Sequence, residues 1–145
     1  MSAKMTLKEK QDEIVEEFAF FDDWMDKYDY IISKGKDLAP MDEQYKLESN
    51  LIKGCQSNLW LHAEMQGAII HFSADSDAII AKGLVALMLE VFNDRTPEEI
   101  IQEDIYFIEK IGLKSHLSPT RSNGLHALLK QIKMYALVFS QSVQH

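Results

Sequence analysis

Cys55 is the only cysteine of this 145-residue chain, and it is the residue with the greatest chemical reactivity. It stands in the stretch GCQSNLW, after Gly54 and before the polar Gln56 and Ser57, so it falls where an extended strand would break. A thiolate at such a break could attack an electrophilic sulfur or carbon. Free cysteine is also among the most buried residue types and is usually inert. The pattern alone therefore leaves a functional and a structural role equally open.

A second stretch whose side chains could take part in chemistry is HLSPTRSNGL, residues 116–125. Ser118 and Pro119 predict an ordinary helix start. His116 and Arg121 flank that start, although the helix dipole does not favour cations there. The same helix N-terminus could hold an anion, such as a thiolate or a carboxylate. By itself this stretch is weak evidence for a site.

A third group is Asp75-Ser76-Asp77, directly before a predicted helix. Capping of that helix explains one aspartate, and it is the interpretation we favour. The other aspartate could accept a hydrogen bond from the cysteine segment or form an ion pair with Arg121. The sequence contains no Walker A, GxGxxG, HExxH or GxSxG motif.

Metal and cofactor chemistry is not expected in this chain. A lone cysteine cannot hold an iron–sulfur cluster, and structural zinc sites usually take several thiolates. The five histidines show no tight ligand spacing such as HxxxH. We therefore expect neither a metal nor a cofactor to be bound.

Charge and composition narrow the classes of partner. The net charge is −8, which argues against binding to nucleic acid or to an anionic membrane. The first fifty residues carry 13 acidic and 7 basic side chains, an acidic flank available to a basic protein, although a solvated surface is the simpler interpretation. The opening MSAKMTLKEK lacks the apolar core of a signal peptide, and no stretch reaches the roughly 18 apolar residues of a membrane span. We expect a cytoplasmic protein, in which a lone thiol stays reduced.

The elements that must position these residues begin with helices. Thr6 to Glu9 has the form of a capping box, and apolar residues follow at helical spacing as far as Ile32. Lys34-Gly35-Lys36 predicts a helix end. We expect one long helix or two consecutive ones, broken near residues 21–23, whose aromatic side chains pack in the core.

The middle of the chain changes to a period of two. Residues 58–65 and 68–74 predict two antiparallel strands joined by a turn at Gln66-Gly67, and residues 50–53 predict a third strand. Further helices follow from residue 75, from Thr96-Pro97 with an end at Gly112, and from Ser118-Pro119. The sequence therefore predicts a single α+β domain over residues 1–145, with a small three-stranded antiparallel sheet flanked by helices.

Taken together, these motifs resemble the SufE-type sulfur acceptors of iron–sulfur cluster assembly. The similarity runs from about Leu7 to Ala136. The stretches that carry it, in the family's order, are DWMDKYDYIISKGKDLAPM, GCQSNLW, SDAIIAKGL, TPEEI and HLSPTRSNGL.

The resemblance implies a sulfur carrier rather than an enzyme, with a fold shared with IscU-type scaffolds. Cys55 would accept persulfide sulfur from a cysteine desulfurase, stimulate that enzyme, and deliver the sulfur to an iron–sulfur scaffold complex. Pyridoxal phosphate would belong to the desulfurase, and this chain would be a monomer or a weak homodimer. We expect Gln56, Asp77, His116 and Arg121 to support the thiol, the last two by favouring its thiolate form.

A persulfide also needs protection from oxidants, and we expect Leu51, Leu59 and Trp60 to shelter it. Our hypothesis is that the loop of residues 54–57 holds the sulfur inward at rest and swings outward in the desulfurase complex. Two other classes of function stay open. One is a cysteine-dependent hydrolase or transferase with His116 or His62 as the base, and the other is an interaction module with an inert cysteine.

Overall fold

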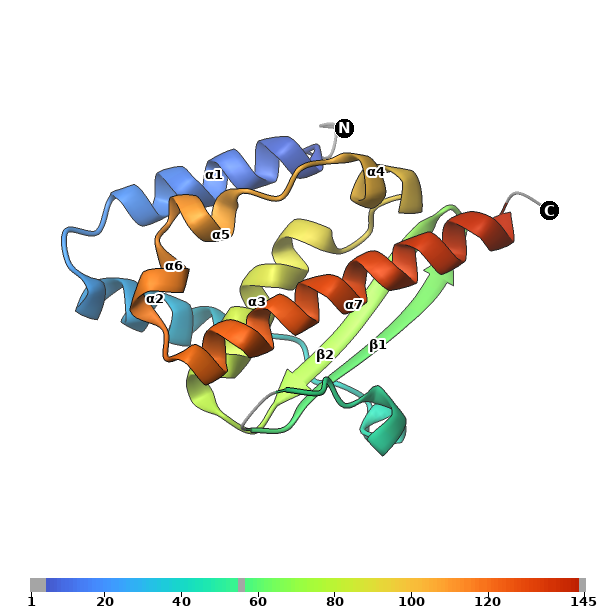
Figure 1. Ribbon diagram of the computed structural model, residues 1–145, viewed down its shortest axis with the longest axis horizontal. Coiled ribbons are helices and arrows are strands. Elements are labelled where there is room, and N and C mark those ends of the chain that lie inside the picture. The colour runs from blue at the N-terminus through green and yellow to red at the C-terminus, as the bar shows by residue number, and fades with distance from the viewer. Residues whose placement is uncertain (1–4, 55–56, 144–145) are drawn as a thin grey trace.

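The computed structural model describes residues 5–54 and 57–143. Within them the chain forms two strands, seven α-helices and two short 3-10 helices (Figure 1). In chain order the elements are α1 (Leu7–Ala19), α2 (Trp24–Lys36), η1 (Glu43–Tyr45), η2 (Glu48–Asn50), β1 (Leu59–Gln66), β2 (Ile69–Ser76), α3 (Ile79–Phe92), α4 (Pro97–Gln102), α5 (Phe107–Lys110), α6 (Leu113–His116) and α7 (Pro119–Val143).

The first two helices follow their local signals. The predicted capping box is present, because the Glu9 N–H donates to the Thr6 hydroxyl at 3.1 Å and the Thr6 N–H donates to the Glu9 carboxylate at 2.9 Å. The chain breaks after α1 and restarts with Asp23 as the N-cap of α2. Helix α2 ends at Lys36, within the predicted Lys34-Gly35-Lys36 stretch, and Gly35 packs against α3 in its last turn.

The hairpin pairs Leu59 with Ser76 at its open end and Gln66 with Ile69 at its turn. The turn is therefore at residues 67–68, one residue later than predicted. Because alternate residues share a face, five core side chains lie on one side of the hairpin: Leu59, Leu61, Ile70, Phe72 and Ala74.

The predicted third strand at residues 50–53 is wrong. Leu51 makes one isolated bridge to Trp60, and the Ile52 N–H donates to the Leu59 carbonyl at 2.8 Å. The extended segment is too short for a strand, since η2 ends at Asn50 and Gly54 turns the chain with a φ of +92°. The described sheet is accordingly two-stranded.

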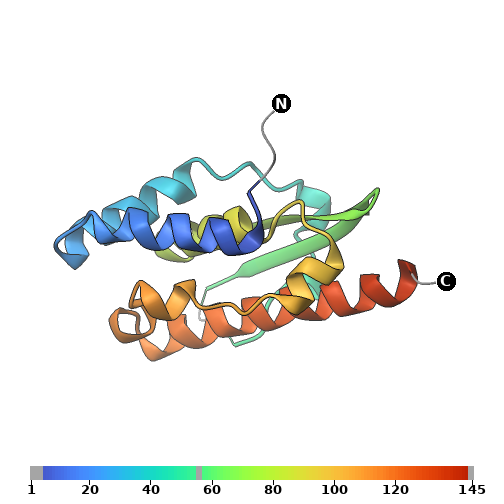
Figure 2. The same cartoon turned by 90° about the horizontal axis from the view of Figure 1, so that it is seen from above.

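Helices complete the core, since a lone hairpin is marginal in water. Figures 1 and 2 show α7 crossing the hairpin on one side, where Tyr135 meets the ring of Phe72 edge-on at 6.5 Å. On the other face Tyr45 stacks on His62 with ring centroids 3.7 Å apart. The buried residues of the hairpin, α1, α3 and α7 belong to one continuous core.

Helices α2 and α3 cross at an unusually short separation. A Cβ atom added at Gly83 would lie 2.2 Å from the Ile31 carbonyl oxygen, and one added at Gly35 would lie 2.8 Å from the Gly83 nitrogen. Only glycine fits at this crossing. The crossing packs α2 tightly against α3, and α3 forms part of the site described below.

The C-terminal helices start where predicted. Thr96 caps α4, whose first residue is Pro97, and α7 begins at Pro119 after Ser118. The helix predicted to run from Thr96 to Gly112 instead breaks into α4 and α5, and Gly112 adopts a left-handed conformation. None of the described helices is both long enough and apolar enough to span a membrane.

Candidate functional site

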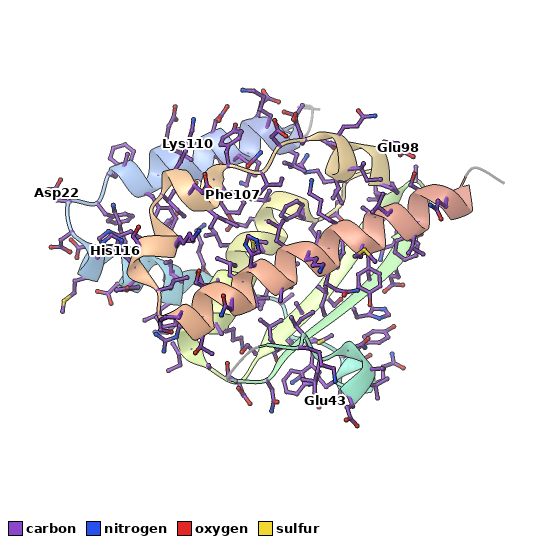
Figure 3. All side chains as sticks on the ribbon, viewed as in Figure 1. Asp22, Glu43, Glu98, Phe107, Lys110 and His116 are labelled. Atoms are coloured by element: carbon purple, nitrogen blue, oxygen red, sulfur yellow. The ribbon has the colours of Figure 1, made fainter. Side chains whose placement is uncertain are left out.

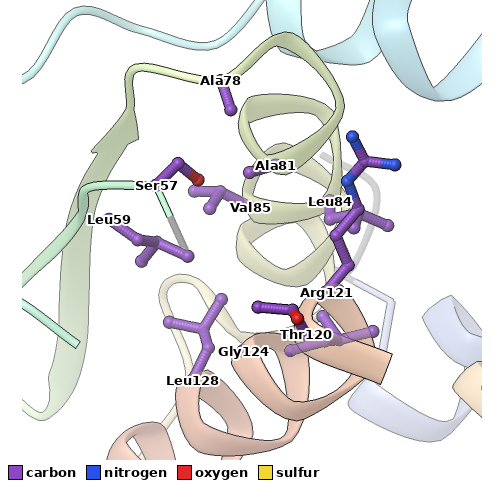
Figure 4. A pocket seen from close by; sticks show the side chains of 11 residues that line it. Ser57, Leu59, Ala78, Ala81, Leu84, Val85, Thr120, Arg121, Gly124 and Leu128 are labelled. Atoms are coloured by element: carbon purple, nitrogen blue, oxygen red, sulfur yellow. The ribbon is translucent and has the colours of Figure 1, made fainter. Parts of the chain in front are cut away.

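A small pocket of about 170 Å³ opens between α3, α7 and the start of β1 (Figure 4). Its walls are mostly apolar, with Arg121 as the charged side chain. The lining residues are Ser57, Leu59, Ala78, Ala81, Leu84, Val85, Thr120, Arg121, Gly124, Leu125 and Leu128.

The pocket lies next to the C-terminal end of the cysteine segment. Cys55 and Gln56 themselves lie outside the described residues. On their C-terminal side, Ser57 lines the pocket. On their N-terminal side, Gly54 has a φ of +92°, and an added Cβ there would meet nothing within 4 Å. The chain thus enters the segment through a turn that glycine favours and leaves it at the pocket wall.

Asn58, just beyond the segment, is tied to the entry of α3. Its N–H and its side-chain amide donate to the Asp77 carboxylate at 3.1 and 2.9 Å. Its carbonyl accepts from the Ser76 hydroxyl at 2.7 Å and from the Asp77 N–H at 3.3 Å. These four hydrogen bonds hold one end of the cysteine segment against the end of β2.

Capping of α3 by the aspartates, which we favoured, is wrong. The N-cap position is Ala78, and no side chain caps the helix there. The carboxylate of Asp77 instead receives hydrogen bonds from Asn58, as in the alternative interpretation. No ion pair joins Asp77 to Arg121 among the described residues.

Asp75 pairs with two lysines on the outer face of the hairpin. Its carboxylate lies 3.0 Å from the Lys46 amine and 3.5 Å from the Lys82 amine, and it accepts from the Ser76 N–H at 2.8 Å. Partial burial raises the pKa of Asp75, but the hydrogen bonds from Lys46 and Ser76 and the nearby charge of Lys82 outweigh that effect. The pKa therefore lies below its ordinary value.

Arg121 is the predicted site residue that reaches the pocket. It lies in the first turn of α7, where its N–H donates to the Ser118 hydroxyl at 3.3 Å. Its guanidinium forms no ion pair with any residue that the structure describes. A cation in this position is available to a negatively charged group at the pocket mouth.

His116 does not join Arg121. Its ring stacks on Trp24 at 3.9 Å, its Nδ1 lies 3.0 Å from the Gly112 carbonyl oxygen, and its own carbonyl accepts a hydrogen bond from the Tyr28 hydroxyl. Figure 3 shows His116 at the end of the molecule that also carries Asp22. His116 is absent from the pocket lining.

The other predicted neighbours of the thiol are dispersed. Of the three proposed sheltering residues only Leu59 lines the pocket. Trp60 lies on the outer face, 5.6 Å from the Lys46 amine, and Leu51 lines a different groove beside α7. His62, the alternative base, is stacked on Tyr45 and is also absent from the pocket lining.

Several residues in the pocket or beside it were missed by the sequence reasoning. Asn58 directly follows the cysteine segment, and that adjacency was an available signal. Ala81 and Val85 share one face of α3, and Ala78 is its N-cap; this helical spacing was an available signal that they lie on one side. Thr120 and Gly124 belong to the HLSPTRSNGL stretch, but the sequence reasoning assigned neither of them a role.

The fold and the pocket together define a small helix-covered α+β protein with an apolar pocket beside its cysteine segment. A family model described as a SufE, Fe–S metabolism associated domain matches residues 12–136. An uncharacterized SufE-like protein from Rhizobium meliloti (strain 1021) is 41% identical over 130 residues, which cover 86% of this chain and 93% of the relative. The chain belongs to the SufE family, which links it to iron–sulfur metabolism.

A solved structure supports the fold. A hypothetical protein from Thermus thermophilus has a solution structure that matches with a TM-score of 0.73 at 20% identity. The match covers 88% of this chain and 93% of that protein. The α+β class is thereby supported, whereas the sheet of this chain has two strands in the described residues.

Proposed function

We propose that this protein is a sulfur carrier that accepts persulfide sulfur on Cys55 from a pyridoxal-phosphate cysteine desulfurase. It stimulates that enzyme and delivers the sulfur to an iron–sulfur scaffold complex in the cytoplasm. Family membership supports the link to iron–sulfur metabolism. The carrier itself binds no cofactor and turns over no substrate alone.

The transfer needs only one thiol. The Cys55 thiolate attacks the outer sulfur of the desulfurase persulfide, the sulfur–sulfur bond of the donor breaks, and the donor cysteine leaves as a thiolate. The product is a persulfide on Cys55, and the same exchange passes the sulfur onward. No oxidant or reductant is consumed. A second nearby thiol would release the sulfur as sulfide, and the chain has no other cysteine.

The observation that carries the proposal is the cation in the pocket next to Ser57. The Arg121 guanidinium has no acidic partner among the described residues, and the remaining lining is mostly apolar. The guanidinium favours an anionic sulfur, and the apolar lining limits access of water and oxidants. We propose that Cys55 reaches this pocket when no partner is bound. The hydrolase alternative gains no support, because neither His62 nor His116 lines the pocket.

The test is direct loading of the thiol. The protein is incubated with a cognate desulfurase, cysteine and pyridoxal phosphate, and its intact mass is measured without reductant. The expected product carries one or more added sulfur atoms on Cys55, and the Cys55→Ser variant carries none. An unmodified wild-type mass, with alanine production showing that the desulfurase is active, would contradict the proposal.

Delivery is tested separately. Loaded protein, freed of desulfurase and cysteine, is mixed with an iron–sulfur scaffold complex and ferrous iron under anaerobic conditions. We expect cluster absorbance to rise as the added sulfur disappears from the carrier mass. Loss of sulfur as free sulfide at the same rate without the scaffold would exclude directed delivery.

A further inference from the structure

A groove separate from the pocket runs along α7 beside β1. It encloses about 350 Å³ and shares no lining residue with the pocket of Arg121. Its lining comes from residues 49–53, from Leu61 of β1 and from one face of α7. Figure 1 shows that, in the described part of the chain, β1 has β2 on one side and no further strand on the other. The groove therefore lies beside an outer strand.

The backbone of β1 has open hydrogen-bonding groups on this outer edge. The N–H and C=O groups of successive residues in a strand point alternately to its two sides. The Leu59 carbonyl points away from β2, because it accepts from the Ile52 N–H at 2.8 Å. Ala63 and Met65 follow at even spacing, so their backbone groups point the same way, and no described residue bonds to them there. Unpaired groups of this kind are a template for an added strand.

Helix α7 supplies an apolar surface next to this edge. Met134, which lines the groove, is 49% exposed, and Leu137 and Val138 are 45% and 54% exposed. Residues three and four apart lie on the same face of a helix, so the three side chains form one continuous patch. Large apolar side chains grouped in this way mark an interaction site more often than they occur by chance.

The charge of the groove is opposite to that of the molecule. Lys53 and Lys130 line it, both are exposed, and neither forms an ion pair with any residue that the structure describes. The lining contains no acidic residue. The whole chain has 23 acidic side chains, yet residues 110–145, which include α7, contain none. A protein of net charge −8 therefore presents an apolar and cationic groove here.

We propose that an extended acidic segment of a partner protein binds in this groove and adds to β1 as a strand. The site, here called the edge groove, comprises Lys53, Ala63, Met65, Lys130 and Met134. The backbone of the segment pairs with the open groups of Ala63 and Met65, its apolar side chains lie on Met134, and its carboxylates face the two lysines. Strand addition of this kind takes its affinity from the main chain and its specificity from alternate side chains.

The same observations disfavour two other occupants. A second copy of this chain, related by a two-fold axis at this face, would bring the Lys130 side chains of the two molecules together. An anionic membrane is flat and would be repelled by the net charge of −8, whereas the site is a groove. An extended acidic segment meets both the shape and the charge.

The experiment measures peptide binding to the purified full-length protein by fluorescence anisotropy, without a desulfurase. The probe is a short fluorescein-labelled peptide that alternates glutamate and valine, and the control peptide has lysine in place of glutamate. We expect the control peptide to bind at least roughly tenfold more weakly, and the affinity of the acidic peptide to fall as salt rises. Met134→Glu and Lys130→Glu should each raise the Kd of the acidic peptide roughly fivefold or more. Met25→Glu, at an exposed methionine of α2 outside the groove, should leave it unchanged.

Strand addition has its own test at Ala63. Ala63→Pro removes the outward N–H and leaves the hydrogen bonds between β1 and β2 in place, so it should weaken peptide binding, whereas Ala63→Ser should not. Amide hydrogen exchange of the wild type gives the same information without a substitution. We expect the acidic peptide to slow exchange at Ala63 and Met65.

Three results would overturn the proposal. The first is equal binding of the acidic and lysine peptides, or binding of neither. The second is binding of the acidic peptide that leaves the amide exchange of Ala63 and Met65 unchanged. The third is that Met134→Glu abolishes self-association in sedimentation, or adsorption to phosphatidylglycerol vesicles, while peptide binding stays at the wild-type level.

Discussion

At the scale of single residues, the contrast between Arg121 and His116 defines the site. Both come from one motif, yet Arg121 lines the pocket, while His116 is held between Trp24 and Gly112 by stacking and a hydrogen bond. A histidine engaged in this way fastens α6 to α2. On the proposed function, electrostatic support for a thiolate in the pocket would therefore fall to Arg121.

Replacing Arg121 tests that assignment. We expect Arg121→Ala to lower the rate of Cys55 alkylation by iodoacetamide at pH 7 roughly three- to tenfold, because loss of the cation reduces the thiolate fraction. Arg121→Lys keeps the charge and restores most of the rate, and His116→Ala serves as the matched control. Equal rates for the wild type and Arg121→Ala at every pH would remove Arg121 from the site.

Asp75 gives a pH-dependent prediction. Its folded-state pKa is depressed, so its contribution to stability is complete above the unfolded pKa of about 3.9 and is lost as pH falls through the folded value. Asp75→Asn should therefore lower the free energy of unfolding by about 1 kcal/mol at pH 7, and the difference should vanish near pH 2. Urea unfolding at both pH values measures this. A loss of stability in Asp75→Asn that is larger in acid than at neutral pH would contradict the predicted pH dependence.

At the scale of elements, local signals predicted two helix starts, whereas the aspartate cap of α3 and the third strand were predicted wrongly. The capping box at Thr6 and the Thr96-Pro97 start depend on neighbours within four residues, and both are present. The predicted third strand does not form, because Leu51 makes one isolated bridge to Trp60 and the chain turns at Gly54. The partner of Asp77 could not be read from spacing, because Asn58 lies 19 residues away and meets it only once the hairpin forms.

The crossing of α2 and α3 gives the sharpest prediction at this scale. Alanine normally favours a helix by about 1 kcal/mol over glycine, yet Gly83→Ala should destabilise the protein by about 3 kcal/mol, because its Cβ would overlap the Ile31 carbonyl. Ser33→Ala, exposed on α2, is the control and should change stability by less than about 0.5 kcal/mol. Thermal or urea unfolding measures both. A stabilised Gly83→Ala would show that the helices separate at little cost.

At the scale of the whole molecule, Arg95 joins parts of the chain that are distant in sequence. Its side chain is 4% exposed, and it donates to the Val91 carbonyl at 2.9 Å and to the Met5 carbonyl at 2.5 Å. Its guanidinium lies 3.6 Å from Glu99, whose carboxylate also accepts from the Leu7 N–H at 2.8 Å. Arg95 and Glu99 together thus attach the start of α1 to α3 and α4.

Replacing Arg95 should destabilise the whole fold. We expect Arg95→Ala to lower the free energy of unfolding by about 3 kcal/mol, since it leaves the Val91 and Met5 carbonyls without this donor and Glu99 without its ion-pair partner. Arg95→Lys should recover little, because an ammonium cannot donate in several fixed directions as a guanidinium does. Urea unfolding with a probe on α1 and another on α7 measures the loss. Two separate transitions, with α1 released first, would show that the junction serves only the N-terminus.

The glycine pair at the α2–α3 crossing also constrains which substitutions this domain can accept during evolution. A larger residue at position 35 or 83 requires the two helices to move apart, and α3 carries one wall of the pocket. Drift at either position would thus alter the shape of the pocket without touching any residue that lines it. We therefore expect the two positions to vary together wherever a relative departs from either glycine.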